Sequence, residues 1–334
     1  MKRKKIKAVA LFSGGLDSIL AVKLIMEMGV EVCCLFFKTP FFPNNDKEES
    51  YIEKLAEKND IKFKKVFLGT EYMEMIKKPK FGYGKNYNPC IDCRILMLKE
   101  AKRIMEKGNF DFVFTGEVLG ERPMSQHRDS LSIIERASGL KGKLLRPLSA
   151  KHFEPTIPEE RGWVERLKLL DIKGRSRKPQ LFFAEKFKIK DFLSPSGGCL
   201  LTDQNFTRRL KDSLEHREDS LREIQLLKIG RHFRLPSGAK VIAGRNEEEN
   251  ARILALGTPE ETKLTAVGYK STYVLLLGDP DSFNLKLASG ICARYCDKSG
   301  LDAVPIGLWT ESEKHRKIIN SKALKEVFLK KYML

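Results

Sequence analysis

The feature that most constrains the fold is a two-glycine turn between a buried strand and a helix. Residues 6–12 (IKAVALF) are mostly apolar, which is typical of a strand covered on both faces of a sheet. Apolar residues then recur at helical spacing over residues 16–28, and Ser13-Gly14-Gly15 stands between the two segments. A buried strand that leads directly into a helix through such a turn is typical of an α/β fold.

The same alternation of strand and helix continues beyond this turn. Strands are predicted over residues 30–37, 63–68 and 110–115, with helices over residues 51–59 and 93–107. Strands that alternate with helices form a parallel sheet covered on both faces. We therefore expect an α/β domain with a parallel sheet over residues 1–170.

The alternation of strands and helices does not continue towards the C-terminus of the chain. Residues 171–224 form a basic connector that carries Cys199, and a charged amphipathic helix is predicted over residues 205–227. The sequence RHFRLPSGAKVIAGR then predicts two short strands around a Pro-Ser-Gly turn, and a helix follows near residues 247–256. We expect a smaller α+β domain over residues 225–334.

The chain is strongly basic. A net charge of +18 and a pI near 9.5 favour a polyanionic partner such as a nucleic acid, with a merely solvated basic surface as the alternative. No apolar run approaches the roughly 18 residues needed to cross a bilayer. The basic start leads into a strand and not into a signal-peptide core. We therefore expect a cytoplasmic protein without a membrane partner.

The glycine turn is suited to holding phosphate. Its backbone N–H groups can converge at the start of the following helix, whose N-terminus adds partial positive charge. Ser13 and Ser18 can add hydroxyl donors, and Asp17 can hold the turn or bind Mg²⁺. The Gly-Lys-Ser/Thr ending of a Walker A loop is absent. The string SGGLDS resembles the PP-loop of ATP pyrophosphatases, which cleave ATP between its α- and β-phosphates.

Later segments narrow this resemblance. Cys93-Arg94 opens a helix, TGEVLGERPMSQ follows a strand end, and LLRPLSAK comes downstream. In this order they resemble the 4-thiouridine synthetase family, also known for thiamine biosynthesis, over residues 6–205. The resemblance implies that ATP adenylates a tRNA uridine oxygen, which sulfur then replaces. It also implies nucleotide contacts, mostly at the carboxyl ends of parallel strands, from Leu11, Phe12, Ser13, Gly14, Gly15, Asp17, Ser18, Phe36, Phe37, Arg94, Gly116 and Gln126.

Three of the seven cysteines lie in loop-rich surroundings. Cys90 and Cys93 belong to NPCIDCR, and Cys199 stands in SPSGGCLLT, whereas Cys292 and Cys296 fall in an apolar stretch where packing is expected. A CxxC pair alone can be redox-active, zinc-binding or structural. A zinc site would need four ligands, and the sequence has no second CxxC or nearby histidine pair.

One branch of the PP-loop thiolases has three cysteines in this arrangement. That resemblance implies a 4Fe-4S cluster held by Cys90, Cys93 and Cys199, with the fourth iron open to sulfide. Together with Asp17, these cysteines are the implied catalytic residues. Two alternatives stay open, namely a persulfide carrier with a resolving thiol, and a structural or zinc-binding role.

Basic residues surround the predicted C-terminal hairpin. The sequence IGRHFRLPSGAKVIAGRNEEEN resembles the NFACT-R domain of ribosome-associated quality-control proteins, over residues 228–334, and the resemblance implies RNA binding. An arginine-flanked hairpin suits phosphate contacts, with a solvated basic face as the alternative. The expected RNA-binding residues are Arg231, Arg234, Lys240 and Arg245.

Together these features predict a tRNA sulfurtransferase that uses ATP, Mg²⁺ and a 4Fe-4S cluster. Its expected partners are tRNA and either sulfide or a sulfur donor protein, and a homodimer is the oligomer we consider. A PP-loop ligase or amidotransferase is one rival, but it would not need three positioned cysteines. A non-catalytic RNA-binding protein of the quality-control type is another, but it would have no use for an intact SGGLDS.

Overall fold

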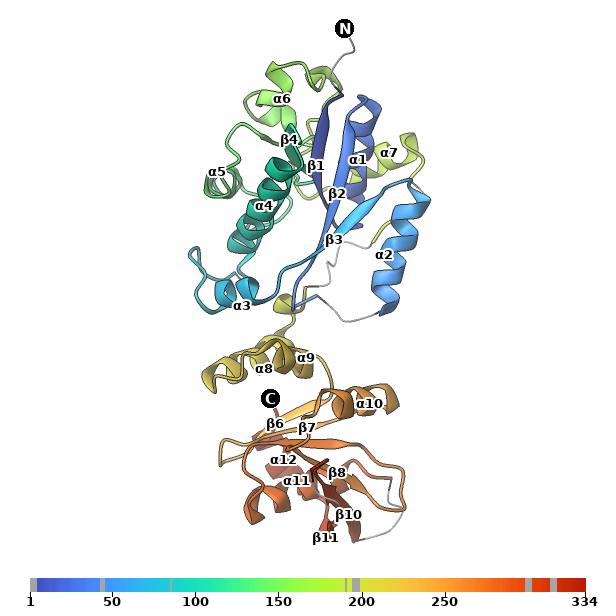
Figure 1. Ribbon diagram of the computed structural model, residues 1–334, viewed down its shortest axis with the longest axis vertical. Coiled ribbons are helices and arrows are strands. Elements are labelled where there is room, and N and C mark those ends of the chain that lie inside the picture. Colours follow the sequence, from blue (N-terminus) through green and yellow to red (C-terminus); the bar gives the residue numbers. More distant parts are fainter. Residues whose placement is uncertain are drawn as a thin grey trace. The chain divides into compact units, whose positions relative to one another are not determined.

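The chain forms two compact units, residues 1–202 and residues 203–334 (Figure 1). The computed structural model describes residues 5–42, 46–84, 86–189, 191–193, 199–297, 302–312 and 317–334. The connector expected over residues 171–224 is divided between the two units, because its first part packs against the parallel-sheet domain. We refer to residues 1–202 as the first unit and to residues 203–334 as the second unit.

The first unit contains a five-stranded parallel sheet. Its strands are β1 (Lys7–Phe12), β2 (Glu31–Lys38), β3 (Phe63–Phe67), β4 (Phe112–Thr115) and β5 (Leu144–Leu145). They lie in the order β3-β2-β1-β4-β5, and every neighbouring pair is parallel. The order therefore reverses between β1 and β4, which is where open α/β sheets bind ligands. The predicted α/β fold is confirmed.

Helices cover both faces of this sheet (Figure 1). Alternate β1 residues, Ala8, Ala10 and Phe12, share one core with α1, α2 and α7, while α4 packs on β1 and β4 and against α5. The helices are α1 (Leu16–Glu27), α2 (Asp46–Lys58), α3 (Thr70–Lys77), α4 (Cys90–Lys107), α5 (Arg128–Ala137), α6 (Ile157–Glu160) and α7 (Lys178–Lys186). Short 3-10 turns occupy Ala150–His152, Arg166–Lys168 and Leu200–Thr202.

Helix α4 begins earlier than predicted. It starts at Cys90, after Pro89, and not at Cys93. The Asp92 carboxylate accepts hydrogen bonds from the backbone N–H groups of Lys80 and Phe81, both at 3.0 Å. Asp92 therefore holds a preceding loop, and both cysteines of the CxxC pair fall in the first turn of the helix.

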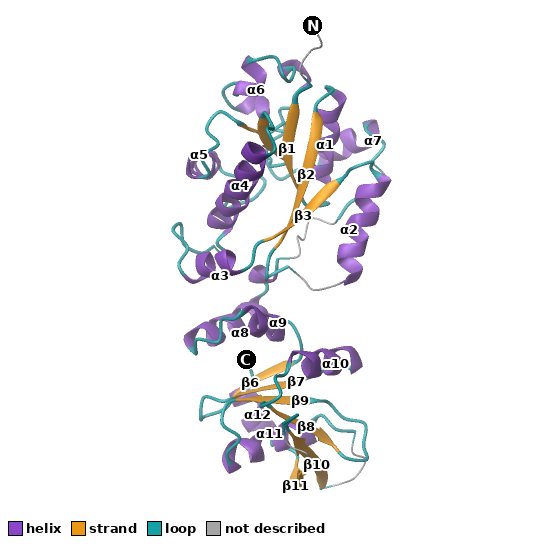
Figure 2. Ribbon diagram, viewed as in Figure 1, coloured by secondary structure: helices purple, strands orange, loops and turns teal. Residues whose placement is uncertain are grey.

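The second unit is the expected smaller α+β domain (Figure 2). Its six-stranded sheet has the order β11-β10-β8-β9-β7-β6, and all neighbouring strands are antiparallel. The strands are β6 (Arg231–Arg234), β7 (Lys240–Ala243), β8 (Thr262–Ala266), β9 (Val274–Leu277), β10 (Ala303–Trp309) and β11 (Lys317–Lys322). The predicted hairpin is β6 and β7, in which Arg234 pairs with Lys240.

The long charged helix predicted over residues 205–227 is two helices. Helix α8 (Gln204–Glu215) ends before Arg217, whose φ of +58° breaks the helix, and α9 (Leu221–Leu227) begins after a Ser220 cap. The other helices of this unit are α10 (Glu247–Leu256), α11 (Ser282–Arg294) and α12 (Glu326–Tyr332). Within the described ranges, none of the helices has the length and apolarity to cross a membrane.

Candidate nucleotide and thiol site

The turn between β1 and α1 is fixed by its two serines. The Ser18 hydroxyl donates to the Gly15 carbonyl at 2.8 Å and accepts from the Ser13 backbone N–H at 3.3 Å. The Ser13 hydroxyl in turn accepts from the Gly15 N–H at 3.4 Å. Gly14 has a φ of +75°, in the left-handed region that favours glycine. The turn therefore directs the N-terminus of α1 towards the carboxyl ends of the strands. A helix N-terminus in this position stabilises a bound anion.

Strand β4 ends directly against this turn. A Cβ atom at Gly116 would lie 2.5 Å from the Asp17 carbonyl oxygen and 2.7 Å from the Ser18 nitrogen. Only glycine fits this close approach of two backbones. The predicted nucleotide residue Gly116 is therefore brought next to the PP-loop.

The Asp17 carboxyl group lies among charged side chains from other segments. Burial raises its pKa, and the Arg177 charge, the nearby Gln180 amide and the Arg122 charge partly offset this effect. Glu121 faces the same place, since burial and the Asp17 charge raise the pKa of its carboxyl group. One Asp17 oxygen, Oδ1, is buried without a hydrogen-bond partner. Carboxylate oxygens are ligands that Mg²⁺ prefers, so this orphaned oxygen suits a metal ion.

A buried carboxylate in the GEVLG segment holds two arginines. Glu117 is 2% exposed, and one of its oxygens lies 3.2 Å from Arg146 Nε. The other lies 3.1 Å from Arg94 Nε, although this ion pair is not aligned as a hydrogen bond. Arg146 also contacts Glu135 at 3.0 Å. The predicted nucleotide residue Arg94 is thus positioned by Glu117 from within the domain.

The other predicted nucleotide residues have buried side chains. The apolar ones lie in the core at strand ends, so a nucleotide can reach only their backbone groups; they are Leu11, Phe12, Phe36 and Phe37. Gln126 is also buried, and its Oε1 accepts from the Arg122 backbone N–H at 3.0 Å. Gln126 therefore shapes the loop that carries Arg122.

The three loop cysteines converge. Cys90 and Cys93 lie in the first turn of α4, and Cys199 immediately precedes a 3-10 turn that is tied to the loop before that helix. The tie is a hydrogen bond from the Asn86 side chain to the Thr202 carbonyl at 2.7 Å. The three thiols are close enough for their charges to act on one another and on a common neighbour. The turn predicted at SPSGG comprises residues 194–198, which lie outside the described residues.

These thiols are partly withdrawn from water, and side-chain donors point at two of them. Burial raises the pKa of each thiol, to about 12 at Cys199, where the Cys93 charge adds to the effect. The Tyr72 hydroxyl donates to the Cys93 sulfur at 3.1 Å, and the Asn88 side chain donates to the Cys90 sulfur at 3.3 Å. Such donors favour a thiolate, and a bound cation would supply the charge that buried thiolates need.

The donor set fits an iron–sulfur cluster better than a single metal ion. Among the described residues, no three His, Cys, Asp or Glu side chains are grouped to hold one metal ion. Cluster thiolates differ, because they bind separate iron atoms and need not meet at one centre. Three half-buried thiols, two of them with side-chain hydrogen-bond donors to sulfur, have the character of cluster ligands and of their supporting shell.

One arginine connects the two halves of the site. The exposed Arg122 side chain lies near enough to lower the pKa of both Asp17 and Cys90. Its charge therefore reaches both the phosphate-binding turn and the first of the thiols. The turn lies at the carboxyl edge of the sheet, where β1 and β4 end, and the influence of Arg122 on both features makes a single site a proposal.

In the second unit, two of the expected RNA-binding residues are engaged in ion pairs, the half-buried Arg234 and the buried Lys240. Arg234 lies 2.6 Å from both Asp212 and Glu218, and Lys240 lies 2.8 Å from Glu218. Lys240 is only 2% exposed. To contact phosphate, these side chains would have to leave the half-buried carboxylates of Asp212 and Glu218 unpaired. The assignment of Arg234 and Lys240 to RNA stays a prediction, and in the structure both side chains join the β6–β7 hairpin to α8 and the turn after it.

The other two hairpin arginines are more accessible. Arg231 lies over the Tyr295 ring, 4.4 Å from its centroid, and the Arg245 side chain is half exposed while it pairs with Glu249. Their contact with RNA stays a prediction.

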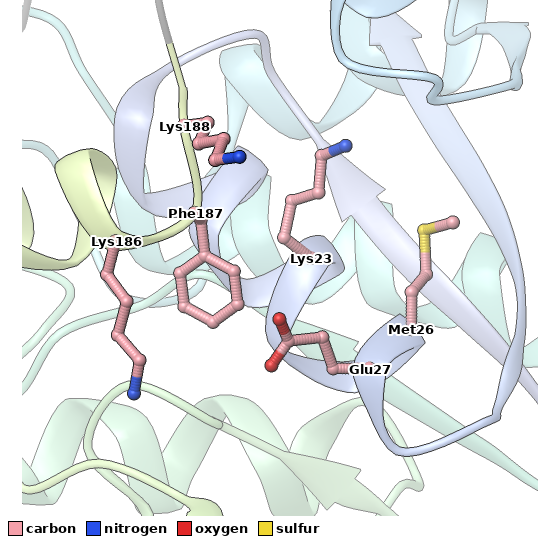
Figure 3. A pocket seen from close by; sticks show the side chains of 6 residues that line it. All are labelled: Lys23, Met26, Glu27, Lys186, Phe187 and Lys188. Carbon is pink, nitrogen blue, oxygen red and sulfur yellow. The ribbon is translucent and has the colours of Figure 1, made fainter.

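A separate basic hollow of about 470 Å³ lies on the first unit, at the end of α1 opposite the PP-loop (Figure 3). Its lining comes from the end of α1 and the end of α7, namely Lys23, Met26, Glu27, Lys186, Phe187 and Lys188. Sequence reasoning gave no sign of it, because these two segments are far apart in the chain.

Several functional candidates could not be found from the motifs. Tyr72 lies in a helix that carries no motif. Arg177 and Gln180 lie in the basic stretch GRSRKPQ, where charge alone does not distinguish a ligand-binding residue from its neighbours. Glu117 and Arg146 lie within the quoted segments GEVLG and RPL, but their pairing depends on the three-dimensional fold. An unusual concentration of polar residues in GRSRKPQ was the one available sign for Arg177.

Comparisons with known proteins match the two units separately. Residues 4–155 match the family model of the thiamine biosynthesis protein (ThiI), and residues 230–333 match that of the NFACT protein RNA binding domain. The chain is 33% identical over 150 residues to a probable tRNA sulfurtransferase of Finegoldia magna, covering 43% of this chain and 36% of the relative. A probable tRNA sulfurtransferase of Thermococcus kodakarensis is 32% identical over 152 residues, covering 42% of this chain and 36% of the relative.

The chain thus spans about a third of the length of these curated relatives. Among solved structures, it is similar to a 4-thiouridine synthetase in complex with RNA and bound ATP. That likeness has 21% identity and a TM-score of 0.41, and it covers 66% of this chain and 52% of the other. The resemblances drawn from the motifs are confirmed at the level of domains. Residues 4–155 are thus similar to the thiamine biosynthesis protein (ThiI) family, and residues 230–333 to the NFACT RNA-binding domain family.

Proposed function

We propose that this protein uses ATP to activate a uridine oxygen of tRNA and replaces that oxygen with sulfur, and that three cysteines hold a 4Fe-4S cluster. The observation that carries the proposal is the convergence of Cys90, Cys93 and Cys199 beside a PP-loop, with Arg122 acting on both. The names of the relatives, probable tRNA sulfurtransferases, support the same reaction.

The chain's own residues suit the activation step. The uridine oxygen attacks the α-phosphorus of ATP, and the bond from that phosphorus to the bridging oxygen breaks to release pyrophosphate. Backbone N–H groups of the PP-loop and the N-terminus of α1 stabilise the phosphate charge. The buried, unpartnered Oδ1 of Asp17 is placed to bind Mg²⁺, which would neutralise the pyrophosphate as it leaves.

The second step replaces oxygen with sulfur and needs no net change of oxidation state when sulfide is the donor. Sulfide attacks the activated carbon, and AMP leaves with the former uridine oxygen. When bound, a cluster with three thiolate ligands leaves one iron open and supplies a place for sulfide. Tyr72 and Asn88 hold the Cys93 and Cys90 sulfurs in position through their hydrogen bonds.

The raised thiol pKa values favour the cluster over the persulfide route. A thiol that stays protonated near neutral pH is a weak nucleophile, and burial raises the pKa of all three loop thiols. A coordinating cation deprotonates such a thiol outright. Buried thiols are therefore better suited to binding iron than to attacking a sulfur donor unaided.

The second unit is proposed to bind the tRNA. Its family match is to an RNA-binding domain, and Arg231 and Arg245 lie on or beside its β6–β7 hairpin with part of their surface accessible. Phosphate contacts of this kind fix the position of RNA without reading its sequence. The target base must leave its stack to reach the site, which costs least in a strained part of the tRNA.

The test combines metal analysis with nucleoside analysis. After anaerobic reconstitution, Cys90→Ala, Cys93→Ala and Cys199→Ala should each lose bound iron and ATP-dependent thiouridine, measured by mass spectrometry of digested tRNA. Cys292→Ala and Cys296→Ala are the matched controls, since both thiols are buried in the second unit, and both should keep iron and activity. Thiouridine formation by iron-free protein would overturn the cluster assignment.

A further inference from the structure

The chain that follows the ThiI-matched residues folds back over the PP-loop. We call residues 173–189, which include α7, the α7 segment. Before the helix, the Gly174 N–H donates to the Leu119 carbonyl at 2.7 Å; after it, the Leu193 N–H donates to the Gly14 carbonyl at 3.0 Å. Helix α7 itself packs against α1. The start of the α7 segment is therefore anchored on the loop that follows β4, and the chain beyond its end is anchored at Leu193 on the loop that follows β1.

Polar groups with no partner gather where this segment meets the PP-loop. Gln180 is fully buried, and neither its amide oxygen nor its amide nitrogen has a hydrogen-bond partner. Arg177 Nε and Asp17 Oδ1 are also buried without one. Nearly all buried polar atoms in proteins are hydrogen-bonded, so four such atoms on three neighbouring side chains indicate a ligand that binds here.

The chemistry of these groups indicates a phosphorylated ligand with a metal ion. Arg177 offers a guanidinium group, whose planar donors match phosphate oxygens. The Phe192 ring packs beside it, 5.6 Å from the guanidinium carbon, and restricts its movement. Asp17 offers an oxygen to a cation, and Gln180 offers a donor that can orient the carboxylate. A triphosphate that carries Mg²⁺ uses all of these groups at once.

We propose that the α7 segment is a wall of the nucleotide site, in which Arg177 binds the β- and γ-phosphates of ATP and Gln180 positions the Asp17 carboxylate. The inference rests on the proposed function only in taking ATP as the ligand. Neither side chain makes or breaks a covalent bond. Arg177 would stabilise the charge of pyrophosphate as it leaves, and Gln180 is a positioning residue.

The first test compares ATP with AMP, because AMP lacks the phosphates that Arg177 is proposed to bind. Calorimetric titration of the full chain should show that Arg177→Gln weakens ATP binding by about 10- to 100-fold, as expected for loss of a charge-assisted phosphate contact. The affinity of the Arg177→Gln variant for AMP should stay within about twofold of that of the unmodified protein, because AMP has no β- or γ-phosphate for Arg177 to contact. Arg177→Lys should recover part of the ATP affinity.

The matched control is Lys178→Gln, which removes the same charge from the next residue, an exposed one. It should leave ATP affinity unchanged. Equal ATP affinity of Arg177→Gln and the unmodified protein would overturn the proposal. An equal loss in the Lys178→Gln control, or a parallel loss of ATP and AMP affinity, would also overturn it, since the effect would then be general charge or misfolding.

The second test separates a ligand-binding Gln180 from a structural one. Gln180→Leu has nearly the same size and removes two buried polar atoms that have no partner. In the absence of nucleotide, the variant should therefore melt at a temperature equal to or above that of the unmodified protein, yet its turnover of ATP to AMP should fall at saturating ATP. A lower melting temperature with unchanged turnover would show that Gln180 only supports the fold.

These outcomes can be told apart from failure of the proposed function. ATP binding needs neither tRNA nor sulfur, so a protein that binds ATP through Arg177 but never thiolates tRNA would overturn the proposed function alone. An unmodified protein that does not bind ATP would overturn both.

Discussion

The hydroxyl group of Tyr72, in α3, donates a hydrogen bond to the sulfur of Cys93, in α4, at 3.1 Å. The Tyr72 side chain is 1% exposed, and its ring packs 5.8 Å from the Phe41 ring, measured between centroids. The donor is therefore held in place by the core and aimed at a sulfur that we propose as an iron ligand. This contact makes the chemistry of the thiol site depend on a residue outside every recognised motif.

The variant Tyr72→Phe tests that contact. It keeps the ring and its packing but removes the donor, so the cluster should still assemble. A hydrogen bond to a thiolate stabilises the more negative, reduced cluster, and its loss should lower the midpoint potential. A bond of about 1 kcal/mol corresponds to a shift on the order of a few tens of millivolts. Electron paramagnetic resonance in a redox titration would measure the shift.

The control is Tyr83→Phe, because the Tyr83 hydroxyl donates to the Ile76 carbonyl. Its potential should match that of the unmodified protein. A Tyr72→Phe protein with an unchanged potential would show that the hydroxyl does not act on a cluster ligand.

Glu117→Gln should destabilise the first unit. The buried Glu117 carboxylate forms ion pairs with Arg94 and Arg146. The neutral amide of the glutamine variant would leave both positive charges without their partner. Removing one partner from a buried ion pair typically costs about 3 kcal/mol or more in the free energy of unfolding. Glu100→Gln breaks an exposed pair with Arg103 and should cost less than about 1 kcal/mol. Urea titrations would compare the two, and equal losses would contradict the role given to Glu117.

Removing residues 203–334 should weaken tRNA binding and spare ATP binding. The PP-loop, Arg122 and the three thiols all lie in the first unit. Most of the net charge of +18 also falls in residues 1–202, so the truncated chain should keep part of its salt-dependent affinity for RNA. The plot of log affinity against log salt should be less steep for the truncated chain. Identical affinities and slopes would assign tRNA binding to the first unit alone.

The second unit should lose stability in acid through Glu218. Burial alone would raise the pKa of this carboxyl group, but hydrogen bonds and charges from Arg234 and Lys240 hold it below its ordinary value of 4.5. A lowered folded-state pKa contributes stability that is complete above the unfolded value and is lost as the pH falls through the folded one. Melting temperatures should therefore drop below about pH 4.5, and less so in Glu218→Gln.

The two tryptophans allow this effect to be followed in one unit. Trp309 lies in the second unit and Trp163 in the first, so a Trp163→Phe background leaves Trp309 as the reporter. An acid drop of equal size with and without Glu218→Gln would assign the pH dependence to other groups.

The fold was predictable because it depends on local patterns. The buried strand, the glycine turn and the helix over residues 6–28 follow from apolar spacing and from backbone freedom at Gly14. The β6–β7 hairpin follows from its turn residues. Helix boundaries were less predictable where a side chain bonds to a distant loop, as Asp92 does with Lys80.

The site was predictable only in part, since its chemistry combines segments far apart in the chain. The motifs identify Asp17 and the cysteines, but the contribution of Arg177 depends on the return of α7 over the PP-loop. Charge alone also could not show the ion pairs of Arg234, because a basic residue on a hairpin looks the same in sequence whether it faces solvent or a half-buried Glu218. Composition records which charges exist and not how they are paired.

The most direct test of the central claim measures AMP and thiouridine in the same reaction with ATP, sulfide and tRNA. The unmodified, reconstituted protein should form the two products in equal amounts. Cys199→Ala should form AMP without thiouridine, because activation precedes sulfur insertion, and Asp17→Asn should form neither. Thiouridine formed without AMP, or formed at the unmodified rate by Cys199→Ala, would contradict a single site in which the PP-loop activates uridine and the three thiols deliver sulfur.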